Sequence, residues 1–259
     1  MKGFIWTLAS ILIVLFSHSQ LFGACAPGFI ATWPKTNTIP KNPIFIVKGY
    51  GNLQGLVKKM GQGWKISLVS TTDTVQCFQT EFYKGQIQIS QICLKPQRDL
   101  LEGHEYRFYS PKLKKWLYDH RKEASCFRWE EFISEWNVKG NRDEKPPFWL
   151  APPKFKRKLL RHLACGPVAY AIFYCLTSDS SSLLVKALVR KKGSKRKDIF
   201  LLEPTDNEIF VGTGMCSAAF GLKLGKDFEV EFTLVDASGN ETPWKGPPIK
   251  FQSPYKSGG

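Results

Sequence analysis

Leu222-Lys-Leu-Gly225-Lys-Asp-Phe228 runs directly into Glu229-Val-Glu-Phe-Thr-Leu-Val-Asp236, and a fold can be predicted outward from these residues. An earlier segment, Leu100-Leu-Glu-Gly103-His-Glu-Tyr106, has the same form and continues as Arg-Phe-Tyr. Both read Leu-x-x-Gly-x-x-aromatic, and both continue with apolar side chains at every second position, the pattern of a half-buried strand. A cysteine precedes each aromatic residue at a similar distance, Cys93 in the first copy and Cys216 in the second. The repeat predicts a mainly β protein with two β-sandwich domains in tandem.

The length and composition fit two globular domains. The chain has 259 residues, of which 43% are hydrophobic and 23% charged, enough for two cores and too apolar for wholesale disorder. The formal net charge of +15 favours partners that carry phosphate, sulfate or carboxylate groups. Such a charge describes solubility and non-specific binding before it describes a specific function.

The N-terminus predicts export. Lys2 is followed by an apolar or small-residue run from Phe4 to Phe16, and small residues then precede a cleavage point after Ser19. This layout is typical of a signal peptide, here residues 1–19, and predicts a periplasmic, cell-surface or extracellular protein. Cleavage near Ala24 is an alternative. Lipid attachment at Cys25 is a third, because Phe22-Gly-Ala-Cys25 loosely resembles the bacterial lipobox.

Seven cysteines in an exported chain indicate a disulfide framework. The odd count means that Cys25 is modified or unpaired, or that another thiol is free. The repeat suggests one disulfide within each domain and one that ties the connecting segment to the second domain, although sequence alone does not fix the connectivity. The suggested pairs are Cys77 with Cys93, Cys175 with Cys216, and Cys126 with Cys165.

The first domain is expected at residues 38–110, after an extended lead-in of little regular structure at residues 20–37. Alternating or β-branched runs predict its strands, two of which form a hairpin through Lys84-Gly85. The predicted strands are Asn42–Lys48, Trp64–Ser70, Cys77–Tyr83, Gln86–Cys93 and the segment after Tyr106.

Residues 111–149 are expected to form a helical connector. Trp129, Phe132, Ile133 and Trp136 have the spacing of one helical face, which is more often used for packing than for binding a partner. The second domain follows at residues 150–252, with a loose tail at residues 253–259. Its predicted strands are Pro167–Leu176, Leu183–Val189, Ile199–Leu202, Glu208–Val211, the segment after Phe228, and Ile249–Phe251.

Taken together, these motifs resemble the immunoglobulin-like and fibronectin type III-like domains of exported bacterial proteins. Thr38-Ile-Pro40-Lys-Asn-Pro-Ile-Phe is similar to the start of such domains, and Val235-Asp-Ala-Ser-Gly239-Asn is similar to a turn near their end. The resemblance implies a tyrosine-corner hydrogen bond at Tyr106, whereas Phe228 lacks the hydroxyl group. It implies an architecture and not a function, because sandwiches serve many unrelated tasks.

The sequence contains no recognisable catalytic motif, and no enzyme activity, metal or cofactor is expected. Cys216 is the one candidate nucleophile, and a hydrolase would need it as a free thiol in a cleft with His162 and Asp179. A structural disulfide at Cys216 is the favoured interpretation. His120 and Cys126 are six residues apart without a paired metal-binding motif, and no glycine-rich phosphate loop is present.

Three basic clusters, at Lys112–Lys115, Lys154–His162 and Arg190–Lys197, are the remaining candidates for function. If they converge in space, they would form a face for lipopolysaccharide, acidic glycans or another polyanion; otherwise they are independent hydrated loops. Export argues against nucleic acid as the partner. The candidate anion-binding residues are Lys154, Lys156, Arg157, Lys158, Arg161, Arg190, Lys191, Lys192, Lys195, Arg196 and Lys197.

The sequence therefore predicts an exported, non-catalytic binding or scaffolding protein of the cell surface or periplasm. Its partner would be an unidentified protein or an envelope polyanion. A polyanion-binding protein that uses the basic loops, and a hydrolase or enzyme-accessory module, are the alternatives.

Overall fold

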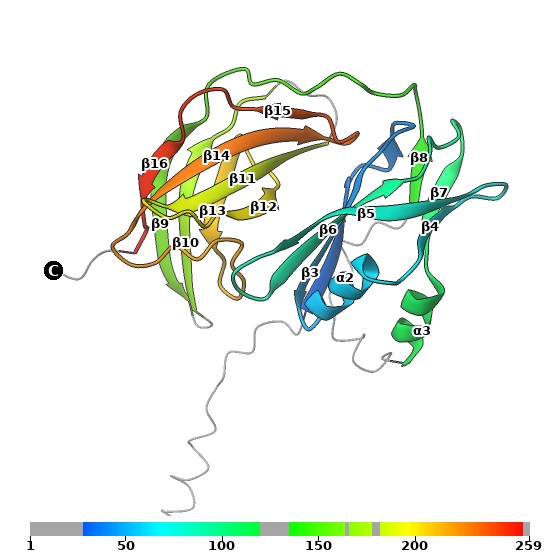
Figure 1. The fold of residues 1–259 in the computed structure, drawn as a ribbon, viewed down its shortest axis with the longest axis horizontal. Helices are drawn as coiled ribbons and strands as arrows, with labels where there is room; N and C mark the ends of the chain where they lie inside the picture. The colour runs from blue at the N-terminus through cyan, green and yellow to red at the C-terminus, as the bar shows by residue number, and fades with distance from the viewer. Residues whose placement is uncertain (1–27, 120–134, 164–165, 178–181, 256–259) are drawn as a thin grey trace, which may run out of the picture.

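The computed structural model describes residues 28–119, 135–163, 166–177 and 182–255. The predicted signal peptide and the candidate residues Cys25, Cys126, Cys165 and Asp179 lie outside these ranges, as do Trp129, Phe132 and Ile133. The described chain is mainly β and is arranged in several sheets, as Figure 1 shows. Among the described residues, no helix has the length and apolar character needed to span a bilayer.

The N-terminal half forms one eight-stranded sheet in the order β1-β3-β6-β5-β4-β7-β8-β2. All its neighbouring strands are antiparallel except β2 and β8, which are parallel. The strands are β1 (Gly28–Trp33), β2 (Thr38–Ile39), β3 (Phe45–Gly51), β4 (Ile66–Val69), β5 (Thr74–Lys84), β6 (Ile89–Pro96), β7 (Glu105–Tyr109) and β8 (Glu135–Val138).

This sheet curls around one core, to which every one of its strands contributes. Residues from Ile30 in β1 to Val138 in β8 belong to the same buried cluster. The long strand β5 makes the curl: its first part pairs with β4, its later part pairs with β6, and a bulge lies between Gln79 and Glu81. The N-terminal half therefore differs from the predicted β-sandwich, because all eight of its strands are joined in one sheet.

Two helices that the sequence analysis missed belong to this half, α2 (Gln54–Gly61) and α3 (Pro111–Asp119). Helix α2 buries Leu56, Val57 and Met60 in the core and exposes Lys58 and Lys59. A helix of two turns contains too few apolar repeats to be distinguished from a turn in the sequence. Such short helices are stable only through tertiary packing, which the local pattern does not show.

The C-terminal half consists of two sheets that face each other. A three-stranded sheet has the order β13-β10-β9, and a second sheet has the order β12-β11-β14-β15, with β16 also paired to β14. These strands are β9 (Lys154–Leu163), β10 (Gly166–Tyr174), β11 (Leu183–Lys191), β12 (Asp198–Leu202), β13 (Glu208–Thr213), β14 (Asp227–Asp236), β15 (Glu241–Pro243) and β16 (Ile249–Gln252).

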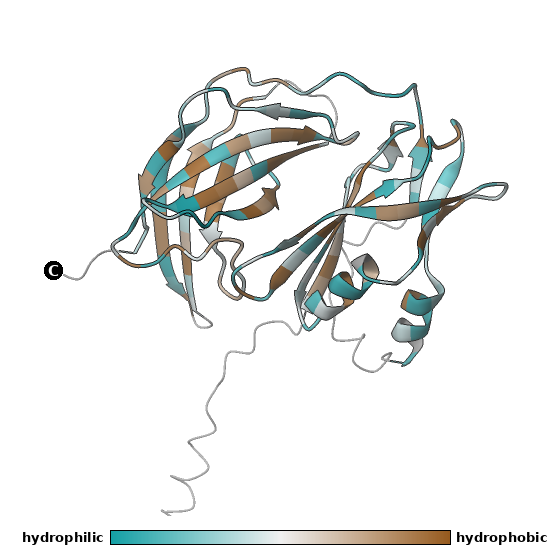
Figure 2. Ribbon diagram, viewed as in Figure 1, coloured by the Kyte–Doolittle hydropathy of each residue, from teal (hydrophilic) through white to brown (hydrophobic). Residues whose placement is uncertain are grey.

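The two halves share a core. Trp33, Ile46, Tyr83 and Ile89 of the N-terminal half are buried in the same cluster as the inner faces of the C-terminal sheets. The residues Ile89–Leu94 of β6 are all buried, because one face of this strand belongs to each core. Hydrophobic colouring is concentrated along the strands of both halves (Figure 2).

Polar contacts also join the two halves, at the boundary between β6 of the N-terminal half and β12 of the C-terminal half. The buried side chain of Gln91 donates to the carbonyl oxygen of Leu201 (2.9 Å) and accepts from the amide of the same residue (3.1 Å). The side-chain amide of Gln91 therefore makes the two hydrogen bonds to β12 that a neighbouring strand would otherwise make. Beside it, the carboxylate of Glu203 pairs with Lys35 (2.7 Å) and Lys48 (3.3 Å).

Two expectations about secondary structure are wrong. Residues 28–33, inside the expected irregular lead-in, form β1; five of the six residues are buried, so the segment lacks the alternation by which a half-buried strand is recognised. Trp136, the last residue of the expected helical face, lies in β8 and is fully buried against Phe45 and Phe108. The reason is tertiary: pairing with β7 and β2 holds residues 135–138 extended, whatever their spacing to residue 129.

Two of the suggested disulfides do not form, since Cys77, Cys93 and Cys175 are free, buried thiols. Cys77 lies in the N-terminal core and Cys93 in the shared core, on the opposite face of the sheet. In the ladder, Cys77 is opposite Pro96, three residues or roughly 10 Å along β6 from Cys93. A disulfide requires Cα atoms within about 7 Å.

Cys175 and Cys216 are also too far apart to pair. Cys175 follows the end of β10 at Tyr174, whereas the loop of Cys216 meets the start of β10, where Gly166 adjoins Met215. Nine residues of extended chain span roughly 26 Å. Cys216 is itself disulfide-bonded, and no disulfide joins two of the described cysteines.

Candidate anion-binding surface

The turn at residues 222–228 lies between the basic segments of the candidate surface. Leu222 and Phe228 are buried, whereas the residues between them are exposed. Gly225 has a φ of +60°, and Gly103 in the earlier copy of the motif has a φ of +77°. Glycine adopts this left-handed conformation without the steric cost that a Cβ atom brings, which accounts for its place in both motifs. The exposed part of the turn carries Lys223 and Lys226.

The basic hairpin lies against this turn. Strands β11 and β12 pair directly, and the chain reverses through Gly193, which has a φ of +79°. The amide of Lys192 donates to the carbonyl oxygen of Asp227 (2.9 Å), and Lys191 is opposite Phe228 in the ladder between β11 and β14. Backbone hydrogen bonds therefore fix the hairpin residues 190–197 beside the turn.

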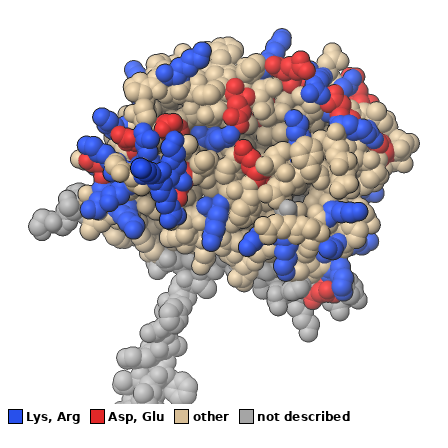
Figure 3. All heavy atoms as spheres, viewed as in Figure 1, with Lys and Arg blue, Asp and Glu red and all other residues tan. Residues whose placement is uncertain are grey.

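The hairpin and the turn enclose a cavity of about 250 Å³. Its cationic side chains are Lys191, Arg196 and Lys223, and its floor includes the buried Phe220 and Phe228. Asp198 also lines the cavity, 3.5 Å from Arg196, so the lining combines two lysines, an ion pair and apolar side chains. In Figure 3, Lys and Arg gather densely at the end of the molecule where Figure 1 places β16 and the adjoining ends of β11 and β14.

The second basic cluster, on β9, reaches the same turn from its other side. Lys158 and Leu160 of β9 line a groove together with Lys226 and Asp227, and Lys158 also donates to Gln252 of β16 (3.0 Å). Two of the three predicted clusters therefore converge on residues 222–228. The third does not, because Lys112–Lys115 lie on α3 at the opposite end of the molecule (Figure 1).

Not every predicted cation is available to a ligand. Lys156 and Arg157 both pair with Glu208, which is buried, and this contact lowers the pKa of Glu208 and raises that of Lys156. Arg190 pairs with Glu229 (2.8 Å), and Arg196 approaches Asp198 (3.5 Å). These cations are partly neutralised by their own neighbours.

A set of lysines is left without such compensation. These exposed side chains have no carboxylate oxygen within 4.0 Å among the residues that the structure describes. They come from the hairpin and from the turn, and they are Lys191, Lys192, Lys195, Lys197, Lys223 and Lys226. We call this set the lysine cluster. The remaining predicted residues of β9, Lys154 and Arg161, are exposed farther along that strand.

Sequence reasoning missed Lys223 and Lys226. Both stand inside the motif from which the fold was predicted, and their proximity to the hairpin depends on the pairing of β11 with β14 across 36 residues of chain. Their position in the sequence could have indicated this. A glycine turn that precedes a strand lies at the end of a sheet, where hairpin tips also lie, so lysines beside such a turn can adjoin a basic hairpin.

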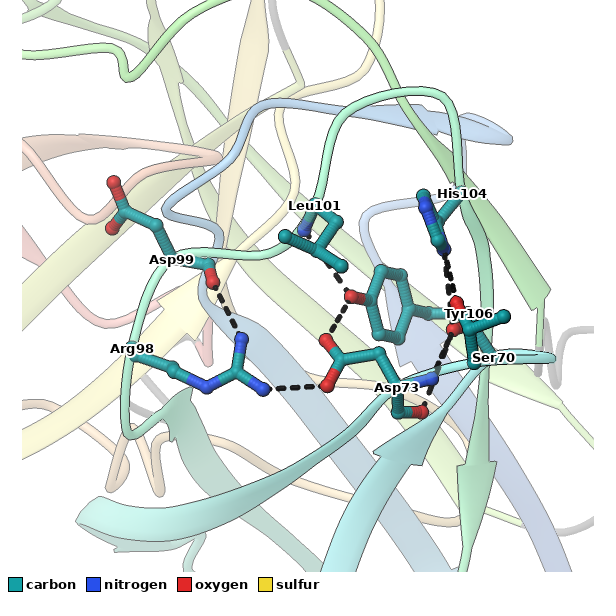
Figure 4. Close-up of polar contacts among 8 residues, drawn as sticks. Ser70, Asp73, Arg98, Asp99, Leu101, His104 and Tyr106 are labelled. Carbon is teal, nitrogen blue, oxygen red and sulfur yellow. Dashed lines mark hydrogen bonds and ion pairs between the residues drawn. The ribbon is translucent and has the colours of Figure 1, made fainter.

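The catalytic alternative loses its nucleophile. Cys216 is disulfide-bonded and carries no free thiolate, and His162 is exposed on β9. Ser70 lies 3.4 Å from Nδ1 of His104, but the carboxylate of Asp73 binds Tyr106 and Arg98, as Figure 4 shows. Among the described residues, no group of three or more His, Cys, Asp or Glu side chains is placed to hold a metal ion.

Figure 4 instead shows a structural corner. The hydroxyl of the fully buried Tyr106 accepts from the amide of Leu101 (3.2 Å) and donates to the carboxylate of Asp73. Hydrogen bonds from Arg98 and Tyr106 lower the pKa of Asp73. The bond between Tyr106 and the amide five residues earlier has the form that the resemblance implied for the first motif.

Comparisons with known proteins give no family. No family model matches the chain, and neither does any curated protein. Among solved structures, a pullulanase from Anoxybacillus sp. LM18-11 complexed with maltotriose is similar at 5% identity and a TM-score of 0.25, over 80% of this chain and 24% of that one. Pullulanase type I from Bacillus subtilis is similar at 8% and 0.24, over 88% and 24%.

The FN1–FN3 domains of chicken CNTN1 are similar at 8% identity and a TM-score of 0.25, over 89% of this chain and 66% of that one. The chain thus spans about a quarter of the length of the pullulanases. Similarity at this level carries no argument about function.

Proposed function

We propose that this protein is an exported, non-catalytic binding protein that holds a polyanion, such as lipopolysaccharide or an acidic glycan, on the lysine cluster. The carrying observation is that six uncompensated lysines from two segments lie at one end of the molecule. Like charges concentrated on exposed loops repel one another in the folded state and contribute nothing to packing. Attraction of an anionic polymer is the benefit that such an arrangement can bring.

The physical form of the site favours a polymer over a small ion. The lysines are exposed, so each single contact is weak in water and is screened over about 10 Å at 0.1 M salt. Several contacts made together by one chain of anionic groups add up, as they do for other polyanions. Cations that line grooves on both sides of the same turn extend the surface over which such a chain could lie.

The test is retention of the protein on immobilised heparin, lipopolysaccharide and a neutral glycan across a salt titration. We expect retention on the two anionic supports that falls steeply with salt, and none on the neutral one. The variant K191Q/K195Q/K197Q should reduce the slope of log affinity against log salt by about two to three units, close to one per lost contact.

A matched control separates location from net charge. The variant K112Q/K114Q/K115Q removes the same charge from α3, at the other end of the molecule, and should leave the slope nearly unchanged. An equal loss in both variants would show that only net charge matters. Absence of retention at low salt would reject polyanion binding and favour a scaffolding role with a protein partner.

Export is part of the proposal and is tested separately. Expression of the intact chain in a host with a secretory pathway should deliver a shortened form whose N-terminus, read by mass spectrometry, begins near Gln20. An uncleaved chain that stays inside the cell would reject this part of the proposal.

A further inference from the structure

A second surface, next to the lysine cluster, is formed where three segments of the chain meet at one end of the strands. The turn after β5 and the loop after β13 pair through a bridge in which Ile87 and Ala218 exchange backbone hydrogen bonds of 3.0 and 2.9 Å. The start of β10 meets the same loop, where a Cβ on Gly166 would lie 3.0 Å from the carbonyl oxygen of Met215.

These loops expose large apolar side chains around a shallow groove. Exposure is 48% for Ile87 and 40% for Met215, and Pro167 and Leu222 also line the groove. Leu163 (48%) is opposite the lining residue Gly166 in the ladder, and Leu224 (56%) follows the lining residues Leu222 and Lys223 in the chain. We call Ile87, Leu163, Met215 and Leu224 the apolar rim. In a folded chain such residues are normally scattered, so two on the groove and two next to its lining residues mark an interaction surface.

The charge around the rim is mainly positive. Residues 84–88 and 213–228 contain Lys84, Lys223 and Lys226, all exposed, and one acidic residue, Asp227. Apolar side chains flanked by lysines match the boundary of an anionic bilayer, where apolar groups enter the acyl region and cations remain at the phosphates. A protein partner of ordinary composition would present both signs of charge and gains no such match.

The course of the chain points the same way. Gly28, the first described residue, is opposite Gly51 in the sheet, and the amide of Gly51 donates to the carbonyl oxygen of Gln88 (2.9 Å). Gly28 therefore lies two strand spacings, roughly 10 Å, from the residue next to Ile87. The described chain therefore begins close to the rim, and position 25, where the sequence allows a lipid, precedes Gly28 by three residues, a length of chain that spans at most about 11 Å.

We propose that the apolar rim docks on an anionic lipid bilayer, with its side chains at the depth of the headgroups and the lysines on the lipid phosphates. The rim shares Lys223 and Lys226 with the lysine cluster, but its apolar side chains are not part of that cluster, and the inference does not depend on polyanion binding.

The test is flotation of the full chain with vesicles of phosphatidylcholine alone and of phosphatidylcholine mixed with phosphatidylglycerol. We expect binding to the mixed vesicles to exceed binding to the neutral ones. The variant I87S/M215S should bind the mixed vesicles about tenfold less, as expected when two half-exposed side chains no longer bury their apolar surface.

A matched control carries the same change at the far end of the strands. Phe148 and Leu150 are 56% and 60% exposed, and the amide of Leu150 bonds to Leu176, beyond the end of β10 that is remote from Gly166. The variant F148S/L150S should bind as the parent does. Equal binding of the two double variants would overturn the proposal.

Hydrogen exchange provides a local readout that does not depend on how strongly the N-terminal segment binds lipid. On mixed vesicles, amides of residues 84–88 and 213–226 should exchange more slowly than in solution, while those of residues 146–150 should not change. Bound protein with unchanged exchange at the rim would overturn the proposal. A dimer in solution that I87S/M215S abolishes would assign the rim to a second copy instead.

The two proposals fail separately. Retention of I87S/M215S on heparin should equal that of the parent, because no lysine is changed. Loss of polyanion retention with vesicle binding intact would reject the proposed function alone, and the reverse result would reject the docking surface alone.

Discussion

Removing the hydroxyl group of Tyr106 tests the interpretation of the first motif most directly. In Tyr106→Phe the ring remains in its fully buried site, while the bonds to the Leu101 amide (3.2 Å) and to the Asp73 carboxylate are lost. A neutral hydrogen bond contributes about 1 kcal/mol and one to a charged group about 1.5–3 kcal/mol. Asp73 keeps its bond to Arg98, so part of the second contribution survives.

We therefore expect Tyr106→Phe to lower the free energy of unfolding by about 2–3 kcal/mol. The measurement is urea denaturation, followed by fluorescence and by circular dichroism to establish whether the two transitions coincide. Tyr109→Phe is the control: it lies in the same strand, is 49% exposed, and should change the free energy by less than about 0.5 kcal/mol.

The pH dependence gives the sign of the Asp73 contribution. Bonds from Arg98 and Tyr106 lower the pKa of Asp73 in the folded protein, so its contribution is present above the unfolded pKa of roughly 3.9 and is lost as the pH falls below it. The difference between the parent and Tyr106→Phe should narrow over that range. An effect no larger than that of Tyr109→Phe, or one that grows on acidification, would refute the reasoning.

Three further predictions concern the boundary between the halves and the cysteines. Gln91→Leu removes both partners of the buried Leu201 peptide groups and should destabilise the protein by about 2–4 kcal/mol in urea denaturation, whereas Gln79→Leu, on an exposed site, should have little effect. Burial acts to raise the pKa of Glu203, but the charges of two lysines outweigh this effect and lower the pKa. The parent should therefore lose stability as the pH falls below roughly 4.3, and Glu203→Gln should reduce that loss. An unchanged profile of stability against pH would contradict this prediction. Burial raises the pKa of three thiols to about 12, so alkylation followed by peptide mass spectrometry should label them only after unfolding, and rapid labelling of the native protein would show that they are accessible: Cys77, Cys93 and Cys175.

Local pattern was sufficient wherever a strand has one buried face and a clear turn. The alternation at Ile66 and Leu68, the hairpin through Lys84-Gly85, and the strand that follows Phe228 could all be predicted, because a period of two residues places every second side chain in a core. The structure supplies the reason for the glycine in both motifs: Gly103 and Gly225 have positive φ, which glycine adopts without the steric cost of a Cβ atom.

The pattern failed where distant segments determine the local state. Trp136 has helical spacing but lies in a strand, because β7 and β2 pair with its backbone. The cysteine pairing also failed, because the two faces of β6 belong to different cores, and equal sequence distance does not imply the same face.

Periodicity and turn chemistry act over a few residues, so they predicted a mainly β chain, its principal strands, its turns and its basic segments. Which surfaces those segments form depends on the fold as a whole. It brought the hairpin at residues 190–197 and the turn at residues 222–228 together and left the lysines of α3 at the other end. It also joined Ile87 to the loop of Met215. These contacts depend on ladder registers between strands far apart in the chain, and no local pattern encodes which strands become neighbours.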